Sequence, residues 1–379
     1  MNQLNEIINQ IRLKYAPDKR VAIFNVTAEE LQGGSFRLKG ETNNESARQE
    51  LMSKLSELKY EISGNILLLP SADLTGKNYA VVNVSVANLR TAPEHHAEMA
   101  TQSLLGFPVK VFQKSHGWYQ VQTNDGYIAW VDGDGIALMN KKPFDDWNNS
   151  DKVIYTDFYG SSYSSADINS VPVSDIVKGA LLKFISEENN FVKTEYPDGR
   201  TAYIPSSRCM KYTEWLKGIK LNEEALIATA KSFMGIPYLW GGTSTKGVDC
   251  SGFTKSVYFF NGVQLPRDAS QQVFTGDPVD TKDGFANLKP GDLLFFGTKA
   301  SNGTKEKITH VAMYIGNNEY IHSSGRVRIN SLDTEKENFS QHRFSTFIRA
   351  KRILTSLDKN GVVQLKPDRV LTGAANETK

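Results

Sequence analysis

An internal repeat is the strongest constraint on how this chain can fold. Residues 106–131 align with residues 179–204 without a gap, at an offset of 73 residues. Each copy places an Asp-Gly pair, Asp125-Gly126 or Asp198-Gly199, between two short strand-like runs. Asp-Gly in such a setting is a strong local signal of a β-hairpin, and short strands at close spacing favour small β-barrels. We therefore predict two consecutive barrels, over residues 76–142 and 143–215.

The region before the repeat is expected to form a small α/β module over residues 1–75. One helix is marked by Ile7, Ile8 and Ile11, and a second is expected over residues 44–58. Strands are expected at residues 20–26, 35–40 and 66–70. Nothing in this module suggests chemistry, so we expect a spacer or packing role.

Composition limits the classes of function. The 379 residues are 40% hydrophobic with a net charge of +2, which describes a soluble chain of two to four domains. Nucleic-acid binding is not expected, because it would require a basic domain. No stretch approaches the ~20 apolar residues of a membrane span. The first residues lack the basic start and apolar core of a signal peptide. The compartment is therefore left open: cytoplasm, or periplasm or cell envelope if a leader has been removed.

Cys250 is the candidate nucleophile. It follows a glycine-rich stretch and Asp249, and it precedes an amphipathic helix expected to run to about Asn261. The first turn of a helix favours an anion, and such a setting can lower a cysteine pKa from ~8.5 into the range ~3.5–7.5. We therefore expect a thiolate at Cys250. The second cysteine, Cys209, is interpreted as a structural free thiol, because pairing it with Cys250 would consume the nucleophile.

Two histidines lie in a predicted hairpin. His310 belongs to a strand at residues 308–315, and His322 belongs to the returning strand after the turn at residues 316–318. Because residues alternate along a strand, both imidazoles share a face only if the loop is odd-numbered or a bulge intervenes. We predict one of these two, with His310 as general base and His322 fixing its orientation. The alternative is that a lone cysteine is a small buried hydrophobe and that the histidines are ordinary polar groups.

The surrounding motifs resemble those of the NlpC/P60 family of cysteine peptidases, over about residues 221–353. They are Tyr-Leu-Trp-Gly-Gly (238–242), Asp-Cys-Ser-Gly-Phe (249–253), Leu-Pro-Arg (265–267), Lys-Pro-Gly-Asp-Leu-Leu-Phe-Phe (289–296), Thr-His-Val-Ala-Met-Tyr-Ile-Gly (309–316) and Tyr-Ile-His (320–322). The resemblance implies an α+β fold with a papain-like catalytic domain, which we place at residues 216–354. Family members cut peptidoglycan stem peptides, typically between D-γ-glutamate and the following diamino acid. Residues 355–379 would be an appended strand or a mobile extension.

Both repeats, the first with Asn88-Leu89-Arg90 followed by Pro93 and the second more divergent, resemble bacterial SH3 (SH3b) domains. The whole layout resembles stem-peptide-recycling endopeptidases, in which the first SH3b domain closes the cleft and selects a free N-terminal L-alanine. An ammonium group in a confined pocket must be paired. The candidate counter-charges and aromatic walls are Asp249, Glu98 or less favourably Glu94, and Tyr127 or Trp118. For the barrel residues among these, the alternative is solvated loop charges and core aromatics.

The remaining candidates come from their positions in the matched motifs. Tyr238 is expected to donate to the oxyanion together with the backbone N–H of Cys250. Ser251, Ser270 and Trp240 are expected to contact the substrate. Arg267 would bind a substrate carboxylate or act as a structural clamp. No metal, no cofactor and a monomeric chain are expected.

The sequence thus predicts a cysteine endopeptidase that cleaves the γ-D-glutamyl-diamino acid bond of murein stem peptides and releases L-Ala-D-Glu. One alternative is a hydrolase of polymeric cell wall that is tethered by its SH3b domains. Another is a wall-binding protein with an inert catalytic domain. The sequence does not distinguish diaminopimelate from lysine at the third stem position.

Overall fold

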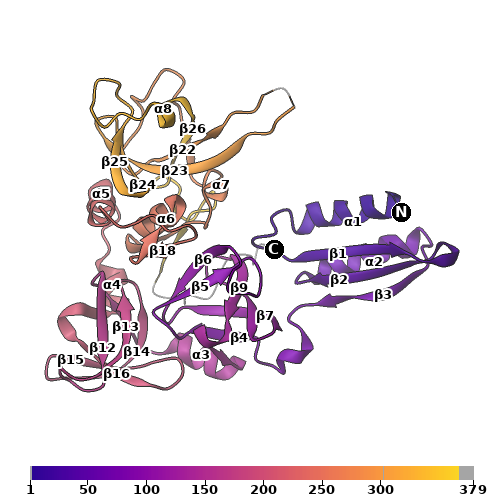
Figure 1. Cartoon of the computed structure of the whole chain (residues 1–379), viewed down its shortest axis with the longest axis horizontal. Helices are drawn as coiled ribbons and strands as arrows, with labels where there is room; N and C mark the ends of the chain where they lie inside the picture. Colours follow the sequence, from indigo (N-terminus) through magenta and orange to yellow (C-terminus); the bar gives the residue numbers. More distant parts are fainter. Residues whose placement is uncertain (1, 302, 367–379) are drawn as a thin grey trace.

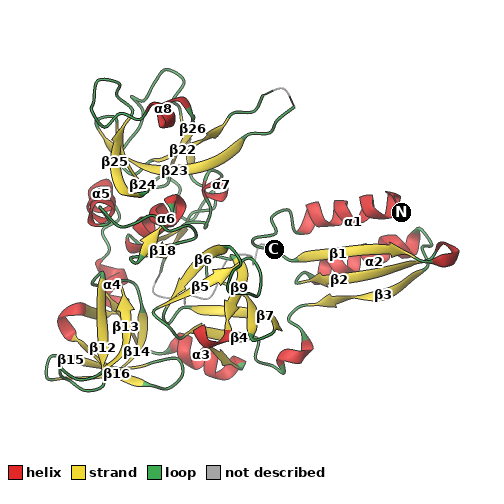
Figure 2. Cartoon of the chain, in the orientation of Figure 1, coloured by secondary structure: helices red, strands yellow, loops and turns green. Residues whose placement is uncertain are grey.

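The structure is a computed structural model that describes residues 2–301 and 303–366. Two β-barrels lie next to each other, an N-terminal α/β module projects beside the first barrel, and a mixed α+β unit completes the chain (Figures 1 and 2). The α+β class predicted from the sequence is confirmed.

The N-terminal module is a three-stranded sheet covered on one side by two helices. Strand β1 (Phe24–Glu30) is antiparallel to β2 (Phe36–Thr42), and β2 is parallel to β3 (Ile62–Leu68). Helices α1 (Asn2–Tyr15) and α2 (Glu45–Glu57) pack on them through a core that includes Leu4, Ile11, Leu38, Leu51 and Leu55. Short 3₁₀ turns lie at Gln32–Gly34 and Ala72–Leu74.

Two strands of this module differ from the prediction. The strand expected at residues 20–26 begins at Phe24, because the preceding backbone is held by the first barrel: the Ile128 N–H donates to the Arg20 carbonyl (2.6 Å). The strand expected at residues 66–70 runs instead from Ile62 to Leu68. Its first residues, which follow Ile62, are polar or glycine and give no apolar alternation, so only pairing with β2 identifies them.

The repeat becomes two seven-stranded sheets of the same strand order. The first sheet contains, in chain order, β4 (Tyr79–Val82), β5 (Val86–Arg90), β6 (Met99–Leu104), β7 (Pro108–Ser115), β8 (Trp118–Gln122), β9 (Ile128–Asp132) and β10 (Ile136–Met139). The second contains β11 (Lys152–Tyr155), β12 (Tyr159–Tyr163), β13 (Pro172–Val177), β14 (Leu181–Glu188), β15 (Phe191–Glu195), β16 (Thr201–Pro205) and β17 (Cys209–Lys211). Every strand of the second sheet begins 73 residues after its counterpart, so the gap-free offset in the sequence extends to the whole unit.

Helix α3 (Lys141–Asn149) joins the two sheets and packs on the first one. Phe144 stacks on Tyr79 of β4, with ring centroids 4.6 Å apart, and Trp147 donates to the Gly106 carbonyl (3.1 Å). The helix therefore crosses the limit between residues 142 and 143 that the repeat predicted.

In the C-terminal unit, helix α6 (Cys250–Phe260) packs on a six-stranded antiparallel sheet. The spatial order is β21 (Asp277–Val279), β26 (Phe347–Arg352), β22 (Leu293–Thr298), β23 (Lys307–Gly316), β24 (Glu319–Ser324) and β25 (Arg326–Ser331). Other elements are α4 (Tyr212–Gly218), α5 (Glu223–Ser232), β18 (Thr243–Ser244), β19 (Gly247–Val248), β20 (Val263–Gln264), α7 (Ala269–Gln272) and α8 (Gln341–Ser345). The predicted helix at Cys250 is confirmed, and it ends at Asn261-Gly262, where Gly262 has φ +79°.

Part of the C-terminal extension is an appended strand, as one of the two alternatives proposed. Strand β27 (Val363–Gln364) pairs with β20 in an antiparallel arrangement. The rest of the extension, residues 367–379, lies outside the described residues.

Candidate functional site

Cys250 is the first residue of α6, and Asp249 caps the helix. The Asp249 side chain accepts a hydrogen bond from the Gly252 N–H (2.7 Å), which satisfies one of the unpaired donors of the first turn. The sequence encodes this start locally, because Asp is a favoured N-cap residue and the apolar face follows at once.

Cys250 is only 8% exposed. Burial raises its pKa to about 11, the Asp249 carboxylate adds to this rise, and hydrogen bonds from the backbone of Val311 and Ser251 oppose it. The expectation of a thiolate at Cys250 is therefore wrong for the free protein. The cost of burying an anion outweighs the favourable effect of the helix terminus, and the thiol is neutral at pH 7.

The bulge predicted in the histidine hairpin is confirmed. Strands β23 and β24 pair through Met313 and Ile321, and then Gly316 pairs with Glu319, so that Ile315 is the extra residue. The turn itself has two residues, Asn317 and Asn318, both with positive φ, rather than the three of the odd-loop alternative. The bulge restores the alternation that places both histidines on one face.

Strands β23 and β24 pair only near their turn. The two histidines and the start of α6 meet where these strands separate. His322 directly follows the last paired residue of β24, Ile321, and His310 lies three residues before its partner, Met313. The loop before α6 enters the gap, because the Ser323 hydroxyl donates to the Val248 carbonyl (2.7 Å). The backbone of Val311, the residue after His310, hydrogen-bonds to Cys250. The thiol therefore lies beside the strand that carries His310.

The two imidazoles and Asn330 form a hydrogen-bonded chain. His310 Nε2 and His322 Nδ1 are 2.7 Å apart, and their rings are nearly perpendicular at 89°. His322 Nε2 and Asn330 Oδ1 are 2.9 Å apart, while Asn330 Nδ2 donates to the Asn338 carbonyl (2.7 Å). Because that carbonyl fixes the amide, Asn330 Oδ1 faces His322 and must accept its Nε2–H.

This chain sets the tautomers. If His322 donates from Nε2, its Nδ1 accepts the Nε2–H of His310, and the lone pair of His310 is on Nδ1. Burial lowers the pKa of His310 well below 6.5, and the positive charge of Arg343 acts in the same direction. Burial also lowers the pKa of His322 to about 4, against the hydrogen bond that His322 donates to Asn330. Both imidazoles are therefore neutral at pH 7.

Tyr238 lies near the sulfur as a protonated donor. Its backbone is fixed by a hydrogen bond to the Gly325 carbonyl (3.0 Å). Burial raises the pKa of the phenol, and the charges of Cys250 and Asp249 raise it further. Its hydroxyl thus remains available to donate a hydrogen bond across the neutral pH range.

Asp249 and Arg267 form a buried ion pair. Arg267 is 1% exposed, and its two Nη atoms donate to the two carboxylate oxygens of Asp249 (3.1 and 2.5 Å). Nη1 also reaches Ser251 (3.0 Å), and Nε reaches Thr101 of the first barrel (3.0 Å). Asp249 accepts the Gly241 N–H as well (3.0 Å).

This geometry matches the clamp alternative for Arg267, because the guanidinium is covered and its donors are engaged. Asp249 is equally occupied, so in this structure it neutralises Arg267 instead of standing free for a ligand's ammonium group. Ser251 is held by the same pair (Oγ to Asp249 Oδ1, 3.3 Å).

The first barrel contacts the loop that leads to Cys250. Trp240, which is 61% exposed, donates from Nε1 to Glu98 (2.7 Å). Gly241 has φ +77°, and a Cβ there would lie 2.4 Å from the Met99 carbonyl oxygen, so only glycine permits this approach. The side-chain oxygen of Gln102 accepts from the Thr243 N–H (3.0 Å). The predicted residues Glu98 and Trp240 are thus together, whereas Glu94 lies 3.2 Å from His96.

The N-terminal module reaches the same region, which the sequence did not indicate. Arg20 donates through Nη1 to Asp268 (2.8 Å) and to Ser270 (2.8 Å). Tyr127 of the first barrel also donates to Asp268 (3.3 Å). Arg20, from the module expected to have a spacer or packing role, therefore contacts the predicted residue Ser270 directly and Tyr127 through their shared partner Asp268. The sequence patterns also did not point to Asn330. It lies two residues after Arg328 on the strand that follows His322, so alternation along that strand would have placed it on the histidine face.

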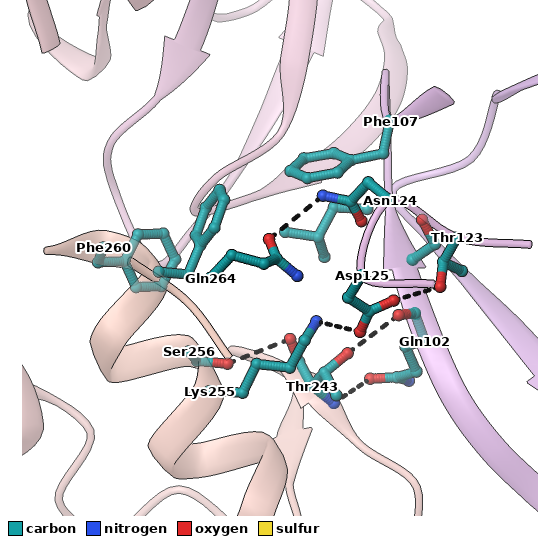
Figure 3. Close-up of a pocket in the computed structure, with 13 residues that line it drawn as sticks. Gln102, Phe107, Thr123, Asn124, Asp125, Thr243, Lys255, Ser256, Phe260 and Gln264 are labelled. Atoms are coloured by element: carbon teal, nitrogen blue, oxygen red, sulfur yellow. Dashed lines mark hydrogen bonds and ion pairs between the residues drawn. The ribbon is translucent and has the colours of Figure 1, made fainter. Parts of the chain in front are cut away.

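A separate pocket lies between the first barrel and the flank of α6, and Figure 3 shows it. Lys255 forms an ion pair with Asp125 there (2.9 Å), and Phe107, Phe259 and Phe260 line its apolar part. None of the predicted site residues lines this pocket. It is a junction between units rather than the site of the predicted chemistry.

Three further features of the described residues concern disulfides, metal sites and membrane spans. Neither Cys209 nor Cys250 forms a disulfide. Within residues 2–301 and 303–366, no group of three His, Cys, Asp or Glu side chains has the arrangement of a metal site. No helix in those residues is long and apolar enough to cross a membrane.

Comparison with known proteins identifies two regions. The profile of the NlpC/P60 family matches residues 235–349, and that of the bacterial dipeptidyl-peptidase Sh3 domain matches residues 89–136. A γ-D-glutamyl-L-lysine dipeptidyl-peptidase of Bacillus cereus is 32% identical over 236 residues, which cover 60% of this chain and 67% of that protein. Dipeptidyl-peptidase 6 of Lysinibacillus sphaericus is 28% identical over 281 residues, which cover 70% of this chain and 96% of that protein.

A solved structure supports the same family relationship. The crystal structure of an NlpC/P60 family protein from Bacillus cereus matches with a TM-score of 0.62 and 27% identity, over 73% of this chain and 99% of that one. About a quarter of the present chain therefore has no counterpart in that protein.

Proposed function

The chain belongs to the NlpC/P60 family of cysteine peptidases, and we propose that it hydrolyses the γ-D-glutamyl-diamino acid bond of peptidoglycan stem peptides. We further propose that it requires a free N-terminal L-alanine and releases L-Ala-D-Glu. The observation that carries the proposal is the chain His310–His322–Asn330 beside the thiol of Cys250 at the start of α6. The dipeptidyl-peptidase names of the two relatives support the substrate class.

In the first half-reaction, His310 Nδ1 takes the proton of Cys250 as the sulfur attacks the γ-carbonyl carbon of D-glutamate. Proton transfer at the moment of attack fits a thiol with a raised pKa and a neutral imidazole. The oxyanion accepts hydrogen bonds from the Tyr238 hydroxyl and the Cys250 N–H, a type of donor worth ~3–4 kcal/mol each. His310 then gives its proton to the departing amine, the C–N bond breaks, and a thioester remains.

In the second half-reaction, His310 removes a proton from water, which attacks the thioester carbonyl. The C–S bond breaks, the dipeptide leaves with its new carboxylate, and the thiol is protonated again. His322 accepts the Nε2–H of His310 throughout, and Asn330 holds His322 in the tautomer that can accept it.

The free amino end would bind at the barrel side of the site. Glu98 carries an exposed carboxylate next to Trp240, and it is the available counter-charge because Asp249 is engaged by Arg267. The Tyr127 ring packs in the core of the first barrel, which matches the core-aromatic alternative, and its hydroxyl donates to Asp268 of the catalytic unit. An acetylated alanine would place a neutral amide against Glu98 and would lose the ion pair.

The test is incubation of the protein with L-Ala-γ-D-Glu-diaminopimelate and with its N-acetylated form, with products identified by mass spectrometry. We expect L-Ala-D-Glu from the free peptide only, and no product with Cys250→Ala. Equal cleavage of the acetylated peptide would refute the requirement for a free amine. Cleavage of intact sacculi at a similar rate would favour the tethered wall hydrolase, and no cleavage by the folded wild-type protein would refute the function.

A further inference from the structure

Two arginines lie on the histidine side of the site, and the mechanism above does not use them. Arg343, on α8, is half-buried, and its guanidinium carbon lies 5.8 Å from the centre of the Phe296 ring. That ring is 5.9 Å from the imidazole of His310. Arg343 and the general base thus both lie close to the same aromatic ring.

Arg328 lies next to the second imidazole. It is paired with His322 in the register of β24 and β25, and directly paired residues of adjacent strands point to the same face. Arg328 is exposed, so its guanidinium is accessible to a ligand. The segment before α8 is fixed to this region, because the Asn338 carbonyl accepts the Asn330 amide.

Both guanidinium groups lack an acidic partner in the described part of the chain. On the neighbouring β26, Arg349 is paired with Glu306 and Arg352 with Asp292. No such carboxylate lies within ion-pair distance of Arg328 or Arg343 among residues 2–301 and 303–366. Burial lowers the pKa of Arg343, and the charge of Arg328 acts in the same direction. A half-buried, unpaired cation is costly, so an anionic ligand would be favourable here.

The position of these arginines indicates which part of a substrate they would meet. Glu98 and Trp240 lie on the side of the first barrel, whereas α8 lies on the opposite side of α6 from strands β5 and β6 (Figure 1). If the L-alanine amine points toward Glu98, then the residue after the scissile bond lies toward α8. This step rests on the function proposed above.

We propose that Arg343 and Arg328 form a carboxylate-binding subsite for the departing diamino acid. In a stem tripeptide this residue carries a free α-carboxylate, which the planar guanidinium of Arg343 can bind with two hydrogen bonds. The far end of diaminopimelate carries a carboxylate beside its ammonium group, and this carboxylate can pair with Arg328. The far end of lysine carries only an ammonium group, which Arg328 would repel. The subsite therefore selects diaminopimelate over lysine.

The experiment compares kcat/KM for three substrates: L-Ala-γ-D-Glu-diaminopimelate, L-Ala-γ-D-Glu-L-lysine and L-Ala-γ-D-Glu-L-lysinamide. The wild-type protein should prefer them in that order. Loss of a charge-assisted hydrogen bond corresponds to a factor of about 10 to 100. Arg343→Gln should therefore reduce kcat/KM about 10- to 100-fold for the two acids, mainly through KM, and leave the amide within about threefold. Arg328→Gln should abolish the preference for diaminopimelate over lysine.

The matched control is Arg349→Gln, which removes the same charge from the same unit and should change none of the three values. Equal losses on all three substrates in Arg343→Gln would overturn the proposal, because they would indicate a general effect on the thiol or on folding. Equal use of the acid and the amide by the wild type would also overturn it. If the wild type cleaves none of the three, the proposed function fails; cleavage without discrimination refutes only the subsite.

Discussion

The buried pair between Arg267 and Asp249 allows a quantitative prediction. Replacing Arg267 by Met keeps most of the side-chain volume but removes all of its hydrogen bonds, to Asp249, Ser251 and Thr101. The carboxylate of Asp249 would then remain buried without its counter-charge. The change should therefore destabilise the catalytic unit and loosen its contact with the first barrel.

The magnitude follows from the surroundings of the carboxylate. Removing one partner of a buried ion pair typically costs about 3–5 kcal/mol. Asp249 would keep the N–H groups of Gly241 and Gly252 as donors, so we expect the lower end, about 3 kcal/mol. With a urea dependence of about 2 kcal/mol per M, the unfolding midpoint should fall by about 1.5 M.

The assay is urea unfolding followed by intrinsic fluorescence, with hydrogen exchange of α6 to assign the transition to the catalytic unit. The double variant Asp249→Asn, Arg267→Met should lose less than the sum of the two single variants, because neither charge is then left unpaired. A midpoint shift below about 0.5 M for Arg267→Met, or strictly additive losses, would refute the reasoning that this pair clamps the site.

Three further predictions concern the histidine chain and the N-terminal module. Asn330→Ala should lower kcat at least about tenfold with little change in KM, because His322 loses the acceptor that fixes its tautomer; an unchanged kcat would contradict this role. The free energy of unfolding should fall as the pH drops from about 6.5 to about 5. Between those values the unfolded chain binds more protons than the folded one, in which the pKa of His322 is about 4 and that of His310 is also lowered. Equal urea midpoints at pH 7.5 and 5.0 would oppose this. Arg20→Ala should reduce kcat/KM without unfolding the catalytic unit, since Asp268 loses a half-buried partner; unchanged kinetics would return the module to the role of a spacer.

Patterns that span few residues were readable from the sequence. The Asp-Gly turns predicted the hairpins of both barrels, because the preference of Asp-Gly for tight turns is a local property. The 73-residue offset then predicted that the same unit occurs twice. The start of α6 at Cys250 followed from its N-cap and apolar face. Alternation along the strands required either an odd-numbered loop or a bulge between the histidines, and the structure contains the bulge.

Tertiary structure decided the electrostatics and the partners. The pKa of Cys250 is raised rather than lowered, because burial depends on what packs over the helix terminus and not on the terminus itself. Arg267 could have bound a ligand or clamped the site, and its contacts with Asp249, Ser251 and Thr101 of the first barrel match the clamp. Arg20 reaches Asp268 from 248 residues away. Sequence thus determined where the reactive groups lie along the chain, whereas long-range packing determined their charge and their neighbours, because desolvation and ion pairing are set by atoms that are distant in sequence.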